Sequence, residues 1–80
     1  MKYRKKPVIV EAIQFTGDNR EEVLMFCNGY AAPNYDYLFI KGIRGMVDVH
    51  KGDWVIKQNA IDYYPCPNEV FNEVYEKVSN

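Results

Sequence analysis

The sequence has few of the side chains that enzymes use for catalysis. Its 80 residues include one histidine, two cysteines and only two Ser/Thr hydroxyls, on Thr16 and Ser79. We place Thr16 at a strand end and Ser79 close to the end of the chain, so neither is expected to act as a nucleophile. His50 precedes a turn and alternates with Val49, which predicts a solvated position without a metal or catalytic partner. We therefore expect a protein that is not an enzyme and that uses no cofactor and no metal.

The two cysteines are too few for the disulfide framework of a secreted mini-domain. Cys27 and Cys66 also lack the C-x-x-C spacing of a metal site. Cys27 lies on an apolar helical stripe and is expected in the core. Cys66 lies at the predicted start of a helix, where the helix dipole lowers a thiol pKa. We favour a small core side chain over a reactive thiol at this position.

The sequence has no long hydrophobic run. The apolar stretch near the N-terminus is short and is interrupted by Glu11, which argues against a signal peptide, and no segment approaches the length of a membrane span. We expect a cytoplasmic protein with reduced thiols and no membrane partner. Glu11 is predicted to be buried in the most apolar strand. An ion pair with a neighbouring-strand lysine or with the basic N-terminus is favoured over a ligand contact.

Apolar and aromatic residues are abundant for so short a chain. They account for 48% and 15% of the sequence, which predicts one packed domain over residues 1–80. The net charge of −1 produces no strong overall attraction to nucleic acid or membrane. The charge is nevertheless uneven, because glutamates gather in the last predicted helix and a basic cluster opens the chain. This cluster consists of Lys2, Arg4, Lys5 and Lys6.

The first part of the chain predicts a strand followed by a helix. Residues 7–15 are apolar on both alternating faces, which is typical of a central strand covered on two sides. Asp18 and Glu21 form a capping-box pattern for a helix over residues 19–28. Gly29 suits the C-terminal cap of that helix.

Four short strands and a second helix are predicted to follow. Residues 30–36 are expected to form a loop, and the strand candidates are YLFIK, GMVDVH, DWVIK and AIDYYP. The spacers GIRG, KGD and QNA are short enough for antiparallel hairpins. Asn68 is a candidate cap for the last helix, whose apolar stripe is Val70, Phe71, Val74, Tyr75 and Val78. The prediction is an α+β fold of order β-α-β-β-β-β-α, with a curled, mostly antiparallel sheet of about five strands and two helices.

Aromatic residues near the strand ends are the candidates for a binding surface. Trp54 follows the KGD turn, and an anchor at the edge of the core is favoured over a ligand contact. Tyr63 and Tyr64 are adjacent and must point to opposite faces, so at least one is expected to face outward. Exposed aromatics beside lysines can stack a base or contact a protein. The partner-binding candidates are Trp54, Tyr35, Tyr37, Tyr63, Tyr64 and Lys57.

The start, the middle and the end of the chain carry three motifs. The chain opens with MKYRKKPVIVEAIQFTGDN, contains GDWVIK and has YYPCPNEVFNEVYEKV near its end. Together they resemble a family of small proteins found in bacteriophage and prophage genomes. The family pattern has a K-K-P opening, a V-E-A-x-Q strand, a G-D-W turn and a Y-P-C helix start, so the resemblance spans nearly the whole chain. Pro67 departs from it, because the family has a lysine between Cys66 and the proline. The resemblance implies an intracellular setting during infection or lysogeny and assigns no reaction.

Three functions remain open. The preferred one is a non-catalytic binding or adaptor module that docks on a host or phage macromolecule through an aromatic-rich sheet surface. The second is a nucleic-acid-associated protein that uses the basic cluster at the N-terminus. The third is a protein that sequesters a small molecule between subunits, with Trp54 and tyrosines as stacking walls. A homodimer is compatible with all three, because self-association stabilises a small domain with exposed aromatics.

Overall fold

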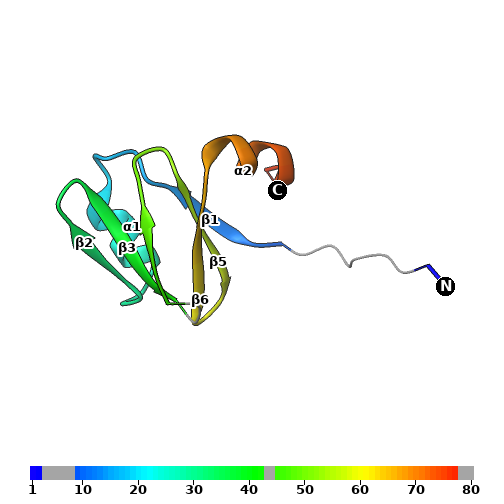
Figure 1. The fold of residues 1–80 in the computed structure, drawn as a ribbon, viewed down its shortest axis with the longest axis horizontal. Coiled ribbons are helices and arrows are strands. Elements are labelled where there is room, and N and C mark those ends of the chain that lie inside the picture. Colours follow the sequence, from blue (N-terminus) through cyan, green and yellow to red (C-terminus); the bar gives the residue numbers. More distant parts are fainter. Residues whose placement is uncertain (3–8, 43–44, 78–80) are drawn as a thin grey trace.

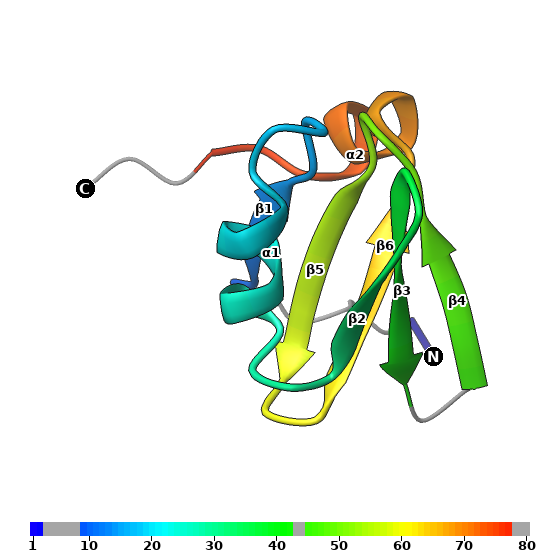
Figure 2. The ribbon, with the colours of Figure 1, turned by 90° about the vertical axis from the view of Figure 1, so that its left-hand side faces the viewer.

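Two antiparallel sheets and two short helices make up the fold. The computed structural model describes residues 1–2, 9–42 and 45–77. In these ranges it has the elements β1 Glu11–Gln14, α1 Arg20–Phe26, β2 Ala31–Asn34, β3 Tyr37–Gly42, β4 Gly45–Val49, β5 Trp54–Asn59, β6 Asp62–Cys66 and α2 Asn68–Val74. The α+β class is confirmed. The predicted single sheet of five strands is instead two three-stranded sheets, of order β1-β5-β6 and β2-β3-β4 (Figures 1 and 2).

β1 is an edge strand, so its predicted central position was wrong. Among the described residues it pairs only with β5, antiparallel, with Ala12 opposite Ile56 and Ile13 opposite Val55. Ile13 packs against the core, and Ala12 lies on the opposite face of the sheet. Residues 7 and 8 of the predicted strand lie outside the described part of the chain.

β2 occupies part of the segment that was predicted to be a loop. It pairs antiparallel with β3. The two strands are joined at Tyr35 and Asp36, where Tyr35 has a φ of 55°. The strand was not predicted because its sequence contains Pro33 and Asn34, and proline and asparagine are rare in strands. Pro33 is tolerated here because β2 is an edge strand of its sheet.

The KGD turn connects the two sheets, so the predicted hairpin between β4 and β5 was wrong. Gly52 has a φ of 98°, which a residue without Cβ adopts readily. The Asp53 carboxylate accepts a hydrogen bond from the His50 backbone N–H at 3.0 Å. The Gly52 N–H donates to the carbonyl of Phe15 at 2.7 Å. This bond to the end of β1 directs the chain away from β4 and into the other sheet.

α1 is shorter than the predicted helix and is capped differently. Its N-cap is Asn19 rather than Asp18, and no side chain bonds the free N–H groups of its first turn. Asn19 Oδ1 accepts from the Thr16 N–H at 2.9 Å, and its Nδ2 donates to the Gln14 carbonyl at 2.8 Å. The side chain therefore fastens the end of β1 instead of the helix.

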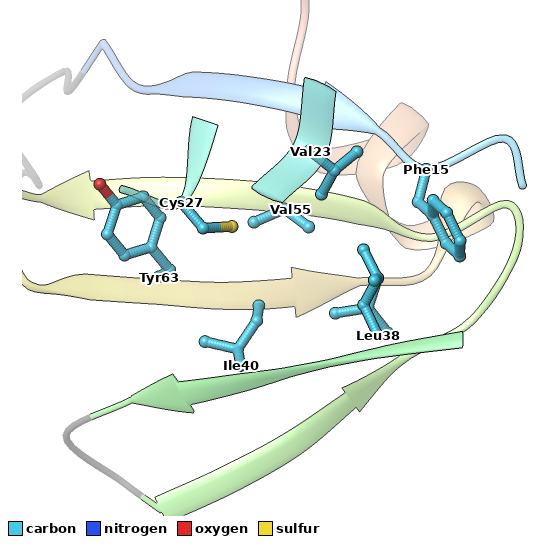
Figure 3. Packing of buried hydrophobic residues seen from close by; sticks show 8 residues of the cluster. Phe15, Val23, Cys27, Leu38, Ile40, Val55 and Tyr63 are labelled. Atoms are coloured by element: carbon cyan, nitrogen blue, oxygen red, sulfur yellow. The ribbon is translucent and has the colours of Figure 1, made fainter. Parts of the chain in front are cut away.

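The core lies between the inner faces of the two sheets and α1 (Figure 3). Tyr63 belongs to it, because its ring stacks on Tyr30 with centroids 5.6 Å apart and meets Phe26 edge-on at 6.1 Å. The core position expected for Cys27 is confirmed. The buried side chains of this cluster are Phe15, Val23, Cys27, Leu38, Ile40, Val49, Val55 and Tyr63.

α2 is attached to the outer face of the β1-β5-β6 sheet, away from this core (Figure 1). Phe71 stacks on Trp54, with centroids 4.0 Å apart and ring planes 3° apart. Pro67 is the N-cap, so the capping role predicted for Asn68 was wrong. Asn68 Oδ1 instead accepts from Trp54 Nε1 at 2.9 Å and from Gln14 Nε2 at 3.3 Å. These contacts hold a helix that has no fully buried residue of its own.

Candidate functional site

The predicted partner-binding residues do not share one surface. Trp54 lies half-buried on the outer face of the β1-β5-β6 sheet, beneath α2. Tyr63 is only 2% exposed and belongs to the core. Tyr64 is half-buried beside it, and its hydroxyl lies 3.1 Å from that of Tyr75. Of the adjacent tyrosines, Tyr64 is therefore the one that points away from the core.

The other predicted residues lie elsewhere on the molecule. Tyr35 is exposed at the turn between β2 and β3, and Tyr37 begins β3. The Tyr37 ring lies 5.0 Å from the imidazole of His50, which is exposed as predicted. Lys57 Nζ forms an ion pair with Glu11 Oε2 at 3.9 Å. The predicted ion pair of Glu11 with a lysine of the neighbouring strand is confirmed. The predicted burial of Glu11 was wrong, because its carboxylate is exposed at the edge of the sheet.

Both cysteines are free and buried. Cys66 is 7% exposed. Its burial, and to a smaller extent the nearby Asp53 carboxylate, raises the pKa of its thiol. Burial also raises the pKa of the Cys27 thiol to about 11. Desolvation therefore outweighs any lowering of the Cys66 pKa by the short α2 helix. At neutral pH both thiols are protonated, which is the state of a packed side chain and not that of a nucleophile.

The predicted nucleic-acid residues are mostly outside the described part of the chain. Lys2 is described and exposed, whereas Arg4, Lys5 and Lys6 are not described. Within residues 1–2, 9–42 and 45–77, no group of three or more His, Cys, Asp or Glu side chains is placed to hold a metal ion. The helices in these ranges are all too short or too polar to cross a membrane.

A groove opens between the start of β1 and α2. We term it the β1–α2 groove, and its volume is about 670 Å³. Most of its lining is apolar, from Ile9, Val10, Ala12, Trp54, Phe71 and Val74. Tyr75, Glu76 and Lys77, which follow α2, complete it. A concave site of this size with mostly apolar walls and a few polar groups is typical of binding sites.

A row of aromatic rings holds α2 in place and so shapes the groove. Phe71 stacks on Trp54 and also on Tyr75, where the centroids are 5.1 Å apart. The Tyr75 hydroxyl continues the row to Tyr64. Each ring contacts the next one, so displacement of any one of them would move its neighbours and change the wall of the groove.

The groove also presents apolar side chains to solvent. Ile9 is 81% exposed and Val74 is 65% exposed, and both line it. Val70 is exposed one turn before Val74. The helical spacing of the last helix predicted that these valines would pack together with Phe71. They do not, because α2 contacts the sheet through Phe71 and leaves its valine flank open.

Sequence reasoning found Trp54 but missed the rest of the groove. Ile9 was assigned to a covered strand and Val74 to a packed stripe. One feature of the sequence could have indicated the exposed valines. The last helix has more apolar positions than a helix of seven residues can bury against one sheet.

The fold and the groove together define an α+β protein of two antiparallel sheets with an apolar groove on the outer face of one of them. Comparisons with protein-family models, with curated proteins and with solved structures found no match. The resemblance to a phage protein family therefore stays a prediction.

Proposed function

We propose that the protein is a non-catalytic binding module that docks a protein partner in the β1–α2 groove. The observation that carries the proposal is the pair of exposed apolar side chains, Ile9 and Val74, above a wall of stacked aromatic rings. Covering apolar surface releases roughly 25 cal/mol per Å². Exposed apolar side chains bordered by charged residues, here Glu76 and Lys77, are typical of interaction sites.

The positions of the reactive side chains support a binding role. Cys27 and Cys66 are buried and protonated at neutral pH. His50 is exposed beside Tyr37, after the last strand of the other sheet. None of the three lines the groove. The groove therefore offers apolar contact area and stacked rings, which are the means by which proteins hold partners.

A capture experiment with a charged substitution in the groove tests the proposal. Val74→Glu places a carboxylate on the groove wall, and Met46→Glu makes the same change at a β4 position that is 67% exposed in the other sheet. We expect a partner from a lysate of the source cells to bind the wild type and Met46→Glu and to be lost with Val74→Glu. Circular dichroism checks that both variants fold. Capture of the same partners by Val74→Glu would remove the groove as the docking site.

A small-molecule site in the same groove is the second candidate. The volume of about 670 Å³ falls within the range of ligand pockets. Trp54 and Phe71 already stack on each other, which leaves fewer open ring faces for a ligand and favours the first candidate. Native mass spectrometry after gentle purification tests this alternative, and an unmodified protein mass would count against it.

A further inference from the structure

We infer that the partner enters the β1–α2 groove as an extended peptide strand that adds to the free edge of β1, with apolar side chains at alternate positions and with basic residues. This inference rests on the proposed function and specifies the form and the chemistry of its partner. It follows from three features: the direction of the β1 backbone groups, the face on which the groove lies, and the charge of α2.

The backbone groups of β1 alternate between its two edges. The Phe15 N–H donates to the Asp53 carbonyl at 2.9 Å, and the Phe15 carbonyl accepts from Gly52 at 2.7 Å. In an antiparallel pair every second residue bonds the neighbouring strand. The odd-numbered residues of β1 therefore bond β5, and Ala12 and Gln14 direct their N–H and C=O groups to the outer edge. The Gln14 carbonyl agrees with this assignment, because Asn19 Nδ2 bonds it from outside the pairing with β5.

Ala12 has an open backbone edge in the described part of the chain. There β1 pairs with β5 alone, and no further backbone bond is made to Ala12. Exposed N–H and C=O groups of an edge strand are a template for another strand. Addition of a strand supplies main-chain hydrogen bonds, while side-chain contacts on the adjoining face give specificity.

The groove lies where the side chains of an added strand would fall. Ala12 and the preceding even-numbered residue, Val10, both line the groove. Side chains of neighbouring strands share faces in register, so every second side chain of an added strand would lie on the same face, towards Val74. This geometry requires apolar side chains at alternate positions of the partner.

The charge of α2, which forms one wall of the groove, favours a basic peptide as the partner. α2 and the three residues after it carry three exposed glutamates, Glu69, Glu73 and Glu76, against one exposed lysine, Lys77. A strand with lysine or arginine complements this charge.

A random-peptide library displayed on filamentous phage tests the inference, because it offers the groove peptides of every side-chain pattern. The wild-type protein serves as bait, with Val74→Lys as the counter-selection, because a lysine there removes an apolar contact of the groove and repels a basic strand. We expect enriched peptides that have apolar residues at every second position and at least one lysine or arginine. A selection that enriches no groove-dependent peptide, or only peptides with apolar residues at helical spacing, would overturn the inference.

Amide methylation of a selected peptide then tests the strand geometry. The peptide is synthesised with a fluorophore and with one N-methyl group at successive positions, and binding is measured by fluorescence polarisation. Loss of an N–H that faces β1 should weaken binding by about tenfold, whereas methylation of the intervening residues should change it by less than about twofold. An effect without a period of two residues would exclude strand addition.

The matching change on the protein is Ala12→Pro. It removes an N–H that points away from β5, at an edge position where proline is tolerated. We expect about tenfold weaker peptide binding, while Met46→Glu, which lies in the other sheet, binds like the wild type. If Ala12→Pro does not fold, as judged by circular dichroism, the methylation series decides the question.

The outcomes separate this inference from the proposed function. A partner that is lost with Val74→Glu but shows no periodic methylation effect would overturn strand addition and leave the groove as the docking site. Concentration-dependent dimers that disappear in Ala12→Pro, with no peptide enriched, would assign the β1 edge to a second copy and overturn the inference.

Discussion

Replacement of Phe71 by alanine should release α2 from the sheet. The helix has seven residues and none is fully buried, so it is too short to be stable without packing. Phe71 provides the central contact, because it stacks on both Trp54 and Tyr75. Without this ring, the hydrogen bonds of Asn68 and the hydroxyl contact of Tyr75, which follows α2, still join this part of the chain to the sheet.

The expected loss of stability is about 2 kcal/mol. Complete burial of a phenylalanine side chain contributes about 1.5–3 kcal/mol, and an aromatic pair adds about 0.5–1.5 kcal/mol. Phe71 is only partly buried, which places the sum near 2 kcal/mol. For a domain of this size the midpoint of thermal unfolding should fall by about 8–16 °C.

Two measurements check this expectation. Urea unfolding gives the free energy, and amide hydrogen exchange should show that residues 68–74 lose protection while β3 keeps it. The matched control is Val70→Ala, which trims an exposed side chain of the same helix and should change the free energy by less than about 0.5 kcal/mol. If Phe71→Ala changes the free energy of unfolding by less than about 0.5 kcal/mol and α2 stays protected from exchange, the ring stack is not what holds the helix.

Three further predictions concern other parts of the molecule. Because burial raises the pKa of Cys27 from 9.0 to about 11, the native state keeps a proton that the unfolded chain loses first. The free energy of unfolding should therefore fall by about 2–3 kcal/mol as the pH rises through this range; an equal fall in Cys27→Val, by urea titration, would contradict this. Gly52→Ala should cost about 1–2 kcal/mol in thermal unfolding because φ is 98°, and Gly52→Asn should cost less. Glu11→Gln removes an exposed ion pair and should change the free energy of unfolding, measured with urea, by less than about 0.5 kcal/mol; a larger loss would show that the pair is structural.

Local patterns predicted the strands β3 to β6 because each has a run of β-branched or aromatic residues between turn signals. The division into two sheets could not be predicted in this way. The KGD spacer is as short as a hairpin turn, and the bond between Gly52 and Phe15 that decides its path joins distant parts of the sequence. β2 was hidden by Pro33, which only an edge strand accommodates.

The groove could be predicted only in part. Trp54 was singled out as an aromatic anchor whose indole N–H needs a partner, and Asn68 supplies that partner. The exposure of Ile9 and Val74 depends on the angle at which α2 meets the sheet. Long-range contacts of Phe71 and Asn68 set that angle, and neither contact leaves a local signal in the sequence.

The register of β1 against β5 determines the order in which the chain can assemble. Glu11 lies opposite Lys57, so the β1-β5-β6 sheet closes only after most of the chain has been synthesised. The β2-β3-β4 sheet consists of two hairpins of consecutive strands and requires only local pairing, which forms faster. During translation β1 therefore leaves the ribosome as an apolar segment that must wait for β5. Until then its backbone groups lack their partner strand, a state in which nascent chains bind chaperones or aggregate.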